Sequence, residues 1–364
     1  MTTSSKFATG SLPQKPATLA DVARLAGVSR SVAGCVLNGG QGNTRCSQAT
    51  AERVCQAARR LNYHANHAAR QLRGKRSHTF GLLVAAAGDP LRAFLVQFLD
   101  AEAVRIGCQT LIGNTVVGPN RFEECVDEFS RRGVDGFLCA VHHWFHVDRA
   151  GLLTRHPSTV FYEDPQIPGA AYVMVDRQTA ARLAVRHLIR RGRQRIGLAV
   201  MTLSRPTHLA RRRGYHLELR AHGLVPDERL IFNGQPHGLA YARYNRSTNR
   251  WDFPQEVMDL VIDALVCRGR ADAIVAHDDF WAASLIRRMK ARGIAVPGDV
   301  AVVGYLNHNL ADWTDPPLTT IDLEHEAAAR SMVEMLEEMV KNGPLPEDRR
   351  VVKIQPKLIV RQSG

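Results

Sequence analysis

Residues 17–40 read ATLADVARLAGVSRSVAGCVLNGG, and this stretch decides the fold of the N-terminal part of the chain. Its first apolar residues recur at the three-to-four-residue spacing of one helix face: Leu19, Val22, Ala23 and Ala26. Thr18 is a favourable N-cap, and Gly27 suits the left-handed residue that follows a helix end. The pattern predicts a short helix between these two residues.

A second and a third helix follow at short intervals. Ser29 can cap the second helix, whose apolar residues are Val32, Val36 and Leu37. Ser47 can cap the third, in which apolar residues repeat every three or four positions: Ala51, Val54, Cys55, Ala58 and Leu61. Two short helices joined by a Gly-Val-Ser turn predict a helix-turn-helix, whose second helix enters the major groove of DNA.

The charge of the chain is concentrated near this module. The net charge of the whole chain is +13, while residues 1–78 carry twelve Lys and Arg against Asp21 and Glu52, which gives +10. A basic module joined to a nearly neutral body indicates a polyanionic partner for the module alone. Neutralising phosphates would give it salt-sensitive affinity for DNA. A basic surface that serves only solubility is the alternative.

The segment HAARQLRGKRS at 67–77 has two interpretations. It is short, basic and too short for a stable helix alone in water. It could fold when docked on DNA, with Leu72 wedged into the minor groove and Arg70 and Arg73 at phosphates. It could equally be a solvated linker.

From Thr79 onward, apolar runs alternate with helical stretches. The runs that predict buried strands are Phe80–Ala86, Gln109–Ile112, Gly136–Ala140, Thr159–Phe161, Arg195–Val200, Ala273–Ala276 and Val300–Val303. This alternation is typical of βα units around parallel sheets. We expect two doubly wound subdomains, with a ligand bound in a crevice at the carboxyl ends of the strands.

Three stretches of the N-terminal part resemble the headpiece and hinge of the lactose/galactose/purine repressor family: TLADVARLAGVS, VLNG and RRLNYHANHAARQLRGKRS. The resemblance continues through IVAHDDFWAASLIRRMKARGIAVPGDVAVVGYLNHNLADWTDPPLTTIDL to PKLIVRQS and covers nearly all of residues 18–362. It implies an all-α helix-turn-helix headpiece and an α/β effector domain like the periplasmic binding proteins, with three crossings between two lobes. Two crossings are expected near Met174–Asp176 and Leu318–Thr320, and the third near the start of the last strand.

The same resemblance implies the residues that contact DNA. Arg30 and Ser31 occupy the recognition positions, and Leu72 is the intercalating residue of a hinge helix. The full set of expected DNA-binding residues is Thr18, Ser29, Arg30, Ser31, Cys35, Asn38, Tyr63, Asn66, Ala69, Arg70, Leu72 and Arg73. Cys35 stands where family members often have an arginine that reads guanine, a contact worth about 1–3 kcal/mol of discrimination. Either the operator therefore differs from the usual sequence of the family, or another side chain such as Arg30 reads the base. Ala65 replaces the usual proline before the hinge.

The resemblance also implies where a ligand binds. The residues expected to bind it are Asp89, Arg92, Arg205, Thr207, Arg211, Trp251, His277 and Asn307. The planar fork of Arg211 could hold a carboxylate, a phosphate or a hydroxyl, whereas a surface arginine is its plainer interpretation. His277 stands where many members have Asn. Leu306 replaces an Asp that clasps sugar hydroxyls or a base nitrogen, which argues against a copy of the sugar-binding mode.

Other classes of protein fit the sequence less well. It contains no Walker A loop, no G-x-G-x-x-G after a strand, no H-E-x-x-H and no nucleophile elbow, so we expect neither an enzyme, nor catalytic residues, nor a cofactor. Asp278-Asp279 is better interpreted as a favourable start of a helix than as an acidic pair. The seven cysteines show no C-x-x-C spacing, so we expect no metal site and no disulfide framework. A secreted sugar-binding protein would need a signal peptide, and an architectural DNA protein would need no ligand domain.

These observations give one hypothesis for the whole chain. A disordered arm at 1–16 precedes a headpiece at 17–64, a hinge helix and linker at 65–78, and a ligand-binding and dimerisation domain at 79–364. Lobe 1 comprises about 79–175 and 320–345, and lobe 2 about 176–319 and 346–364. We expect a cytoplasmic homodimer that binds a near-palindromic double-stranded operator, responds to a sugar-like or nucleoside-like effector and represses transcription. No membrane contact is expected.

Overall fold

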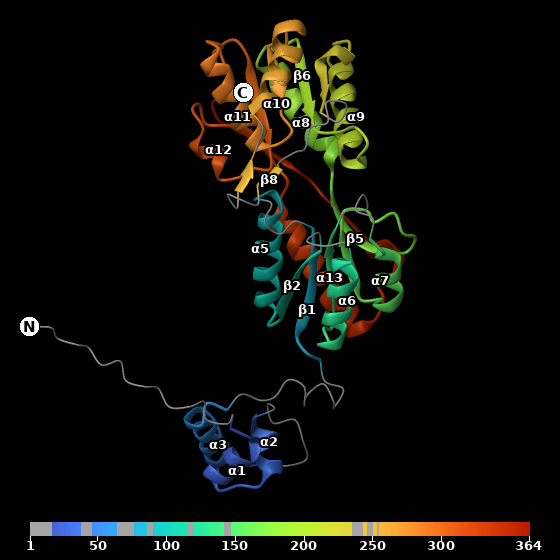
Figure 1. Cartoon of the computed structure of the whole chain (residues 1–364). Helices are drawn as coiled ribbons and strands as arrows, with labels where there is room; N and C mark the ends of the chain where they lie inside the picture. Colours follow the sequence, from blue (N-terminus) through green and yellow to red (C-terminus); the bar gives the residue numbers. More distant parts are fainter. Residues whose placement is uncertain are drawn as a thin grey trace, which may run out of the picture. The chain divides into compact units, whose positions relative to one another are not determined.

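The computed structural model describes residues 17–37, 46–63, 76–85, 90–115, 120–141, 147–234, 243–245, 250–252 and 255–364. At 90–92, 243–245, 250–252 and 255 it describes the backbone alone. The chain divides into two compact units, Met1–Ser77 and His78–Gly364 (Figure 1). Among the described residues no helix is long and apolar enough to span a bilayer.

The first unit contains the three predicted helices, α1 (Leu19–Ala26), α2 (Arg30–Leu37) and α3 (Gln48–Arg60). They enclose a small core of short side chains: Val22, Ala23, Ala26, Ala33, Val54, Ala57 and Ala58. The predicted caps of α1 are confirmed. The Thr18 hydroxyl donates to Asp21 Oδ2 at 2.6 Å and accepts the N–H of the same residue at 3.4 Å. Gly27 is left-handed, with φ of 68°.

The second unit begins with a six-stranded parallel sheet, which with its helices is called the first lobe. Its strands are β1 (Thr79–Val84), β2 (Gln109–Asn114), β3 (Gly136–Ala140), β4 (Thr159–Tyr162), β5 (Ala171–Val175) and β13 (Val351–Ile354). Their order is β13-β5-β4-β3-β1-β2. One face packs against α5 (Pro90–Arg105) and α13 (His325–Asn342). The other packs against α6 (Arg121–Arg131) and α7 (Arg149–Arg155).

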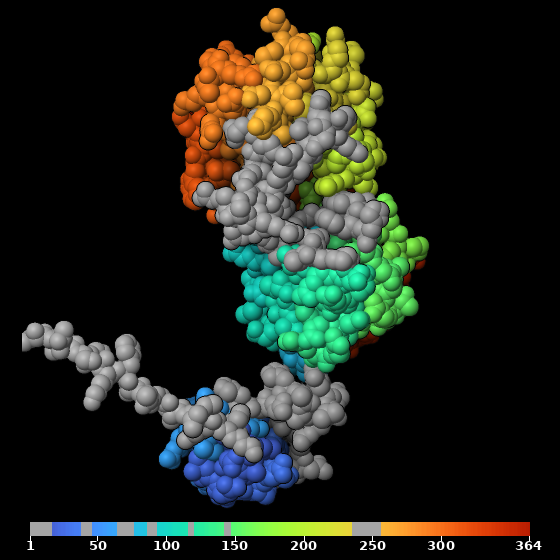
Figure 2. Space-filling view, in the orientation of Figure 1, coloured from blue at the N-terminus to red at the C-terminus, as the bar shows by residue number. Residues whose placement is uncertain are grey.

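A second six-stranded sheet and its helices form the second lobe. Its strands are β6 (Ile196–Val200), β7 (Ile231–Asn233), β10 (Ala273–Val275), β11 (Ala301–Tyr305), β12 (Thr319–Asp322) and β14 (Lys357–Ile359). Their order is β14-β12-β11-β10-β6-β7, and only the pair β12–β14 is antiparallel. In Figure 2 residues from near 200 and residues beyond 255 share the surface of this lobe.

Helices cover both faces of the second sheet. One face packs against α8 (Arg177–Arg190) and α9 (Pro206–Ala221). The other packs against α10 (Gln255–Val261), the π-helical η3 (Ile262–Arg268) and α11 (Asp279–Ala291), with α12 (Leu310–Trp313) nearby. Short 3-10 turns occur at η1 (Glu228–Leu230) and η4 (Glu347–Arg349). β8 (Arg243–Asn245) and β9 (Arg250–Asp252) pair as a small antiparallel sheet of their own.

Two of the expected lobe boundaries differ from the structure. The chain crosses between the lobes after β5, then between β12 and α13, and again between β13 and β14. The second crossing therefore follows Asp322 instead of lying at 318–320, so residues 320–322 belong to the second lobe. Residues 351–354 belong to the first lobe, because β13 pairs with β5 in parallel. β13 has only four residues, and its partner β5 is distant in the sequence, which explains the error.

Each sheet has a topological switch point, the place where the order of the strands reverses, at the same position in its strand order. The order 2-1-3-4-5 occurs twice, as β2-β1-β3-β4-β5 and as β7-β6-β10-β11-β12. In such open sheets, ligands bind outside the carboxyl ends of the strands next to the switch point. These ends lie after β1 and β3 in the first lobe and after β6 and β10 in the second.

Candidate nucleic-acid interface and ligand pocket

The first turn of α2 presents polar side chains to the surface. The hydroxyl of Ser29 accepts the N–H of Val32 at 3.2 Å, which fixes the start of the helix. Ser29, Arg30 and Ser31 are all exposed. The N-terminal residues of the second helix are those that reach base edges in a helix-turn-helix. This turn is therefore the candidate surface for reading a major groove.

The other predicted DNA-binding residues have different environments. Thr18 is exposed, but its hydroxyl is engaged in the cap of α1. Cys35 is half-buried on α2, and Tyr63 packs in part against the core of the three helices. The remaining predictions lie outside the described residues: Asn38, Asn66, Ala69, Arg70, Leu72 and Arg73.

A pocket in the second unit lies at the carboxyl ends of strands of both lobes. Its described lining is Val84, Leu95, Val96, Ala140, Tyr162, Arg177, Arg205, Thr207, His208, Arg211, His277, Asp278, Tyr305, Leu306, Leu323 and His325. The cavity volume is about 150 Å³. Four predicted ligand residues, Arg205, Thr207, Arg211 and His277, are thus brought together from two separate segments.

Arg211 is held rigidly in the wall of this pocket. Its Nη1 donates to the carbonyl of His277 at 2.7 Å and its Nη2 to the carbonyl of Ala276 at 2.6 Å. Its guanidinium carbon lies 3.9 Å from the ring centroid of Tyr305. The side chain is buried, and burial lowers the pKa of Arg211. The alternative interpretation of Arg211 as a surface arginine is wrong.

Two neighbouring imidazoles are fixed as neutral rings. His208 Nδ1 donates to the carbonyl of Thr202 at 2.7 Å, and His277 Nδ1 accepts the N–H of Met201 at 3.3 Å. Burial, followed by the charge of Arg211, lowers the pKa of His208 to about 3. Burial and His208 lower the pKa of His277 well below its usual value. Both rings are therefore uncharged near neutral pH, with Nε2 of His208 left as an acceptor.

An ion pair connects the lobes beside the pocket. Arg177 begins α8 in the second lobe, and its Nη2 lies 2.6 Å from Glu163 Oε1, just after β4 of the first lobe. The same nitrogen donates to the hydroxyl of Tyr162 at 3.2 Å. The Arg177 and Glu163 side chains are 12% and 6% exposed, so water screens this pair little. Burial and Arg177 lower the pKa of the nearby His325 to about 3.

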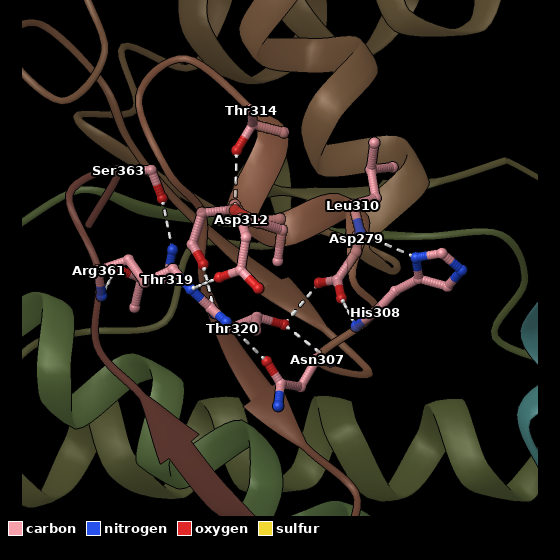
Figure 3. A network of polar contacts seen from close by, with 12 residues as sticks. Asp279, Asn307, His308, Leu310, Asp312, Thr314, Thr319, Thr320, Arg361 and Ser363 are labelled. Atoms are coloured by element: carbon pink, nitrogen blue, oxygen red, sulfur yellow. Dashed lines mark hydrogen bonds and ion pairs between the residues drawn. The ribbon is translucent and has the colours of Figure 1, made fainter.

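Asn307, another residue expected to bind the ligand, is not in the described lining of the pocket. Figure 3 shows it in a network of polar contacts that also includes Arg361, Thr320 and Asp279. Its Nδ2 donates to Asp322 Oδ2 at 2.9 Å, and its Oδ1 accepts from Arg361 at 3.1 Å. With both ends of the amide engaged, Asn307 joins the C-terminal segment to the sheet. Asp89 lies outside the described residues, and the side chains of Arg92 and Trp251 are not described.

Asp279 organises the same network and supports one wall of the pocket. Its carboxylate accepts the N–H groups of Tyr305 and His308, each at 2.7 Å, and the Thr320 hydroxyl at 2.5 Å. Asp278 is the N-cap of α11 and accepts the N–H of Trp281 at 2.8 Å. The carboxylates of Asp278 and Asp279 therefore accept hydrogen bonds from different groups at the start of α11, and both have structural roles, as the sequence suggested.

Sequence reasoning missed several residues of the pocket. Tyr162 and Tyr305 come at or just after the ends of predicted strands, and Arg177 follows the predicted first crossing. Counting every residue at the carboxyl end of a strand as a candidate would have found them. His208 and His325 carry no such signal, because each lies inside the first turn of a helix.

A basic helix-turn-helix unit followed by two doubly wound lobes around a polar pocket defines a DNA-binding regulator with a small-molecule domain. Residues 18–66 match the model of "Bacterial regulatory proteins, lacI family". Residues 77–239 match "Periplasmic binding proteins and sugar binding domain of LacI family", and residues 185–364 match "Periplasmic binding protein-like domain". The chain belongs to the LacI family of transcription regulators.

Relatives match over nearly the whole chain. The HTH-type transcriptional repressor PurR of Photobacterium profundum is 27% identical over 352 residues, 95% of this chain and 98% of that protein. The HTH-type transcriptional regulator GalR of Escherichia coli (strain K12) is 28% identical over 350 residues, 95% of each chain. The solved complex of the transcriptional regulator CelR with cellobiose has 26% identity and a TM-score of 0.65, covering 96% of this chain and 100% of that one.

Proposed function

We propose that two copies of this chain bind a near-palindromic operator and repress transcription under the control of a small metabolite. The exposed first turn of α2, on a segment of charge +10, is the observation that carries the DNA-binding part. Two-fold symmetry of the protein requires two related half-sites in the DNA. This function is supported by the relatives named HTH-type transcriptional repressor PurR and HTH-type transcriptional regulator GalR, and by the similar structure of CelR in complex with cellobiose.

A ligand bound in the pocket would control the affinity of the chain for the operator. It is lined from both lobes, so a ligand in it contacts the two lobes at once and favours one arrangement of them. The Arg177–Glu163 pair already connects the lobes and would be strengthened or replaced as they move. Any difference in ligand affinity between the two arrangements must appear as a difference in operator affinity, because the two equilibria are linked.

Arg30→Ala is expected to lower affinity for the specific operator by about ten- to a hundredfold, since a base-reading arginine contributes about 1–3 kcal/mol. The operator is selected from random double-stranded DNA, and binding is measured by fluorescence anisotropy. Arg59→Ala is the matched control: it removes an equally exposed charge from α3. Arg59→Ala should weaken specific and nonspecific binding alike. Equal effects of the two substitutions on specificity would remove Arg30 from base recognition.

A further inference from the structure

Arg211 brings a buried positive charge to the pocket, and its hydrogen bonds go to neutral groups. Its guanidinium donates to two backbone carbonyls, whereas Arg177 is neutralised by Glu163 through the 2.6 Å ion pair. Asp278, the carboxylate of the described lining, caps α11 and acts on the charge of Arg211 through space, but it makes no ion pair with Arg211 among the described contacts. A buried charge without a paired counterion is costly, so the site favours a ligand that brings a negative charge to Arg211.

Two donors buried in this wall make no hydrogen bond to any described residue. They are Arg211 Nε and the hydroxyl of Tyr305, on residues that are each only 3% exposed. Their groups belong to one stacked pair, with the guanidinium 3.9 Å from the ring centroid. Orphaned buried donors are rare in folded proteins. Here they lie in a cavity wall, where an acceptor on a ligand would satisfy them.

The N-termini of helices around the pocket also favour a negatively charged ligand. Four long helices begin at this pocket: Arg177 is the first residue of α8, Arg205 is the N-cap of α9, Asp278 is the N-cap of α11, and His325 is the first residue of α13. The N-terminus of a helix carries a partial positive charge and favours anions. Asp176 and Asp278 cap α8 and α11 with carboxylates, whereas the caps of α9 and α13 make no side-chain hydrogen bond.

The opposite wall is apolar and the space is small. Val84, Leu95, Val96 and Ala140 of the first lobe and Leu306 and Leu323 of the second supply aliphatic surface. The cavity of about 150 Å³ is smaller than the roughly 300–1,000 Å³ of typical sites for drug-sized ligands. Arg205, the N-cap of α9, is a further cation of the described lining beside Arg211 and the paired Arg177. The small volume, more than the charge count, therefore favours a carboxylate over the bulkier phosphate ester, which carries roughly −1.5 to −2 charges at neutral pH.

We infer that the effector is a small organic monocarboxylate. Its carboxylate accepts hydrogen bonds from Arg211 and from the Tyr305 hydroxyl, and its carbon skeleton lies against the aliphatic wall. This assignment rests on the proposed function, of which it specifies the ligand class. A sugar acid satisfies it as well as an aliphatic or aromatic acid does, whereas a neutral sugar or nucleobase brings no counterion to Arg211.

Matched acid and neutral probes test the assignment on the full chain. The thermal unfolding midpoint is measured with 10 mM benzoate against benzamide, glucuronate against glucose, and with hypoxanthine and glucose 6-phosphate. Because a ligand stabilises the folded state in proportion to ln(1 + [L]/Kd), at least one carboxylate should raise the midpoint and bind at least tenfold more tightly than its neutral partner. The inference is overturned if only neutral compounds or the phosphate ester stabilise the chain, or if no carboxylate does.

Leu306→Asp places a second carboxylate in the lining, and Leu306→Asn is its uncharged match. The carboxylate probe should bind Leu306→Asp at least tenfold more weakly than the original chain, by isothermal titration calorimetry. It should bind Leu306→Asn within about threefold, because the asparagine changes shape and polarity without changing charge. Equal weakening by the two substitutions would mean that charge does not select the ligand, and the inference would fail.

Tyr305→Phe removes one of the orphaned donors. The unfolding midpoint of the free protein should not fall, because the hydroxyl has no hydrogen bond to lose among the described residues. Affinity for the carboxylate probe should fall about fivefold. Unchanged affinity would mean that the carboxylate of the ligand does not accept a hydrogen bond from the Tyr305 hydroxyl, and it would overturn the assignment. Operator binding is measured on the same samples with and without the carboxylate probe: its absence under both conditions would contradict the proposed function, while the affinity for the carboxylate would still test the ligand class.

Discussion

Asp279→Ala is expected to lower the free energy of unfolding of the His78–Gly364 unit by about 3–5 kcal/mol. The carboxylate is fully buried and accepts two backbone N–H groups and one hydroxyl. Alanine removes the acceptor of all three donors, of which the Tyr305 N–H and the Thr320 hydroxyl are buried and the His308 N–H is part-buried, and each buried donor without a partner costs about 1–3 kcal/mol. Urea unfolding followed by circular dichroism measures the loss.

Asp312→Ala is the matched control in the same network (Figure 3). Its carboxylate accepts from Arg361 Nε at 2.7 Å, but its side chain is 59% exposed. Exposed ion pairs contribute roughly 0–1 kcal/mol, so this substitution should be nearly neutral. A loss below about 1 kcal/mol for Asp279→Ala, no more than an exposed pair contributes, would contradict its role as the anchor of the β11–α12 loop.

Gly214→Ala is expected to destabilise the same unit by about 2–4 kcal/mol, although alanine favours helices. A Cβ at this position of α9 would lie 2.1 Å from the carbonyl oxygen of Gln178 in α8. The obstacle is backbone, so the two helices would have to separate, and overpacking of this kind typically costs about 1–3 kcal/mol or more. The gain in helix propensity is only about 1 kcal/mol.

Gly34→Ala is the same substitution where space exists. The nearest atom to a Cβ there is Leu19 Cδ2 at 3.5 Å, an ordinary contact. The headpiece should gain up to about 1 kcal/mol, the usual difference in helix propensity. Calorimetry of the two single variants measures both the expected loss of stability for Gly214→Ala and the expected gain for Gly34→Ala. A neutral Gly214→Ala would show that α8 and α9 can move apart without cost.

The sequence predicts the fold well where its signals are local. Capping residues such as Thr18 and Gly27 mark the ends of α1 because cap geometry depends on a few neighbouring residues. Several strands inside the sheets are continuous apolar runs and were predicted, as β3 shows. β5 and β12 also lie inside their sheets, but they were not among the predicted strands. β13 was missed because it has only four residues, none of them fully buried, and because its pairing with β5 is a contact between distant segments that no local pattern reports.

The candidate site is predicted in part. Arg211 and His277 could be placed by position in the family pattern, and both line the pocket. Asn307 could not be judged in this way, because its neighbours Asp322 and Arg361 come from other segments and take up its hydrogen bonds. The charge balance of the pocket is likewise invisible in sequence, since it depends on which carboxylates are paired: Glu163 with Arg177 is one such case.

Sequence-specific binding is the central claim, and selection of DNA tests it most directly. The purified full-length chain is mixed with genomic fragments at about 50 and about 200 mM salt, the range over which phosphate contacts weaken steeply, and the bound fragments are sequenced. Because base contacts add to the salt-sensitive phosphate term, a shared near-palindromic motif should remain enriched at the higher salt. Binding that disappears at the higher salt, with no motif common to the fragments, would contradict the account.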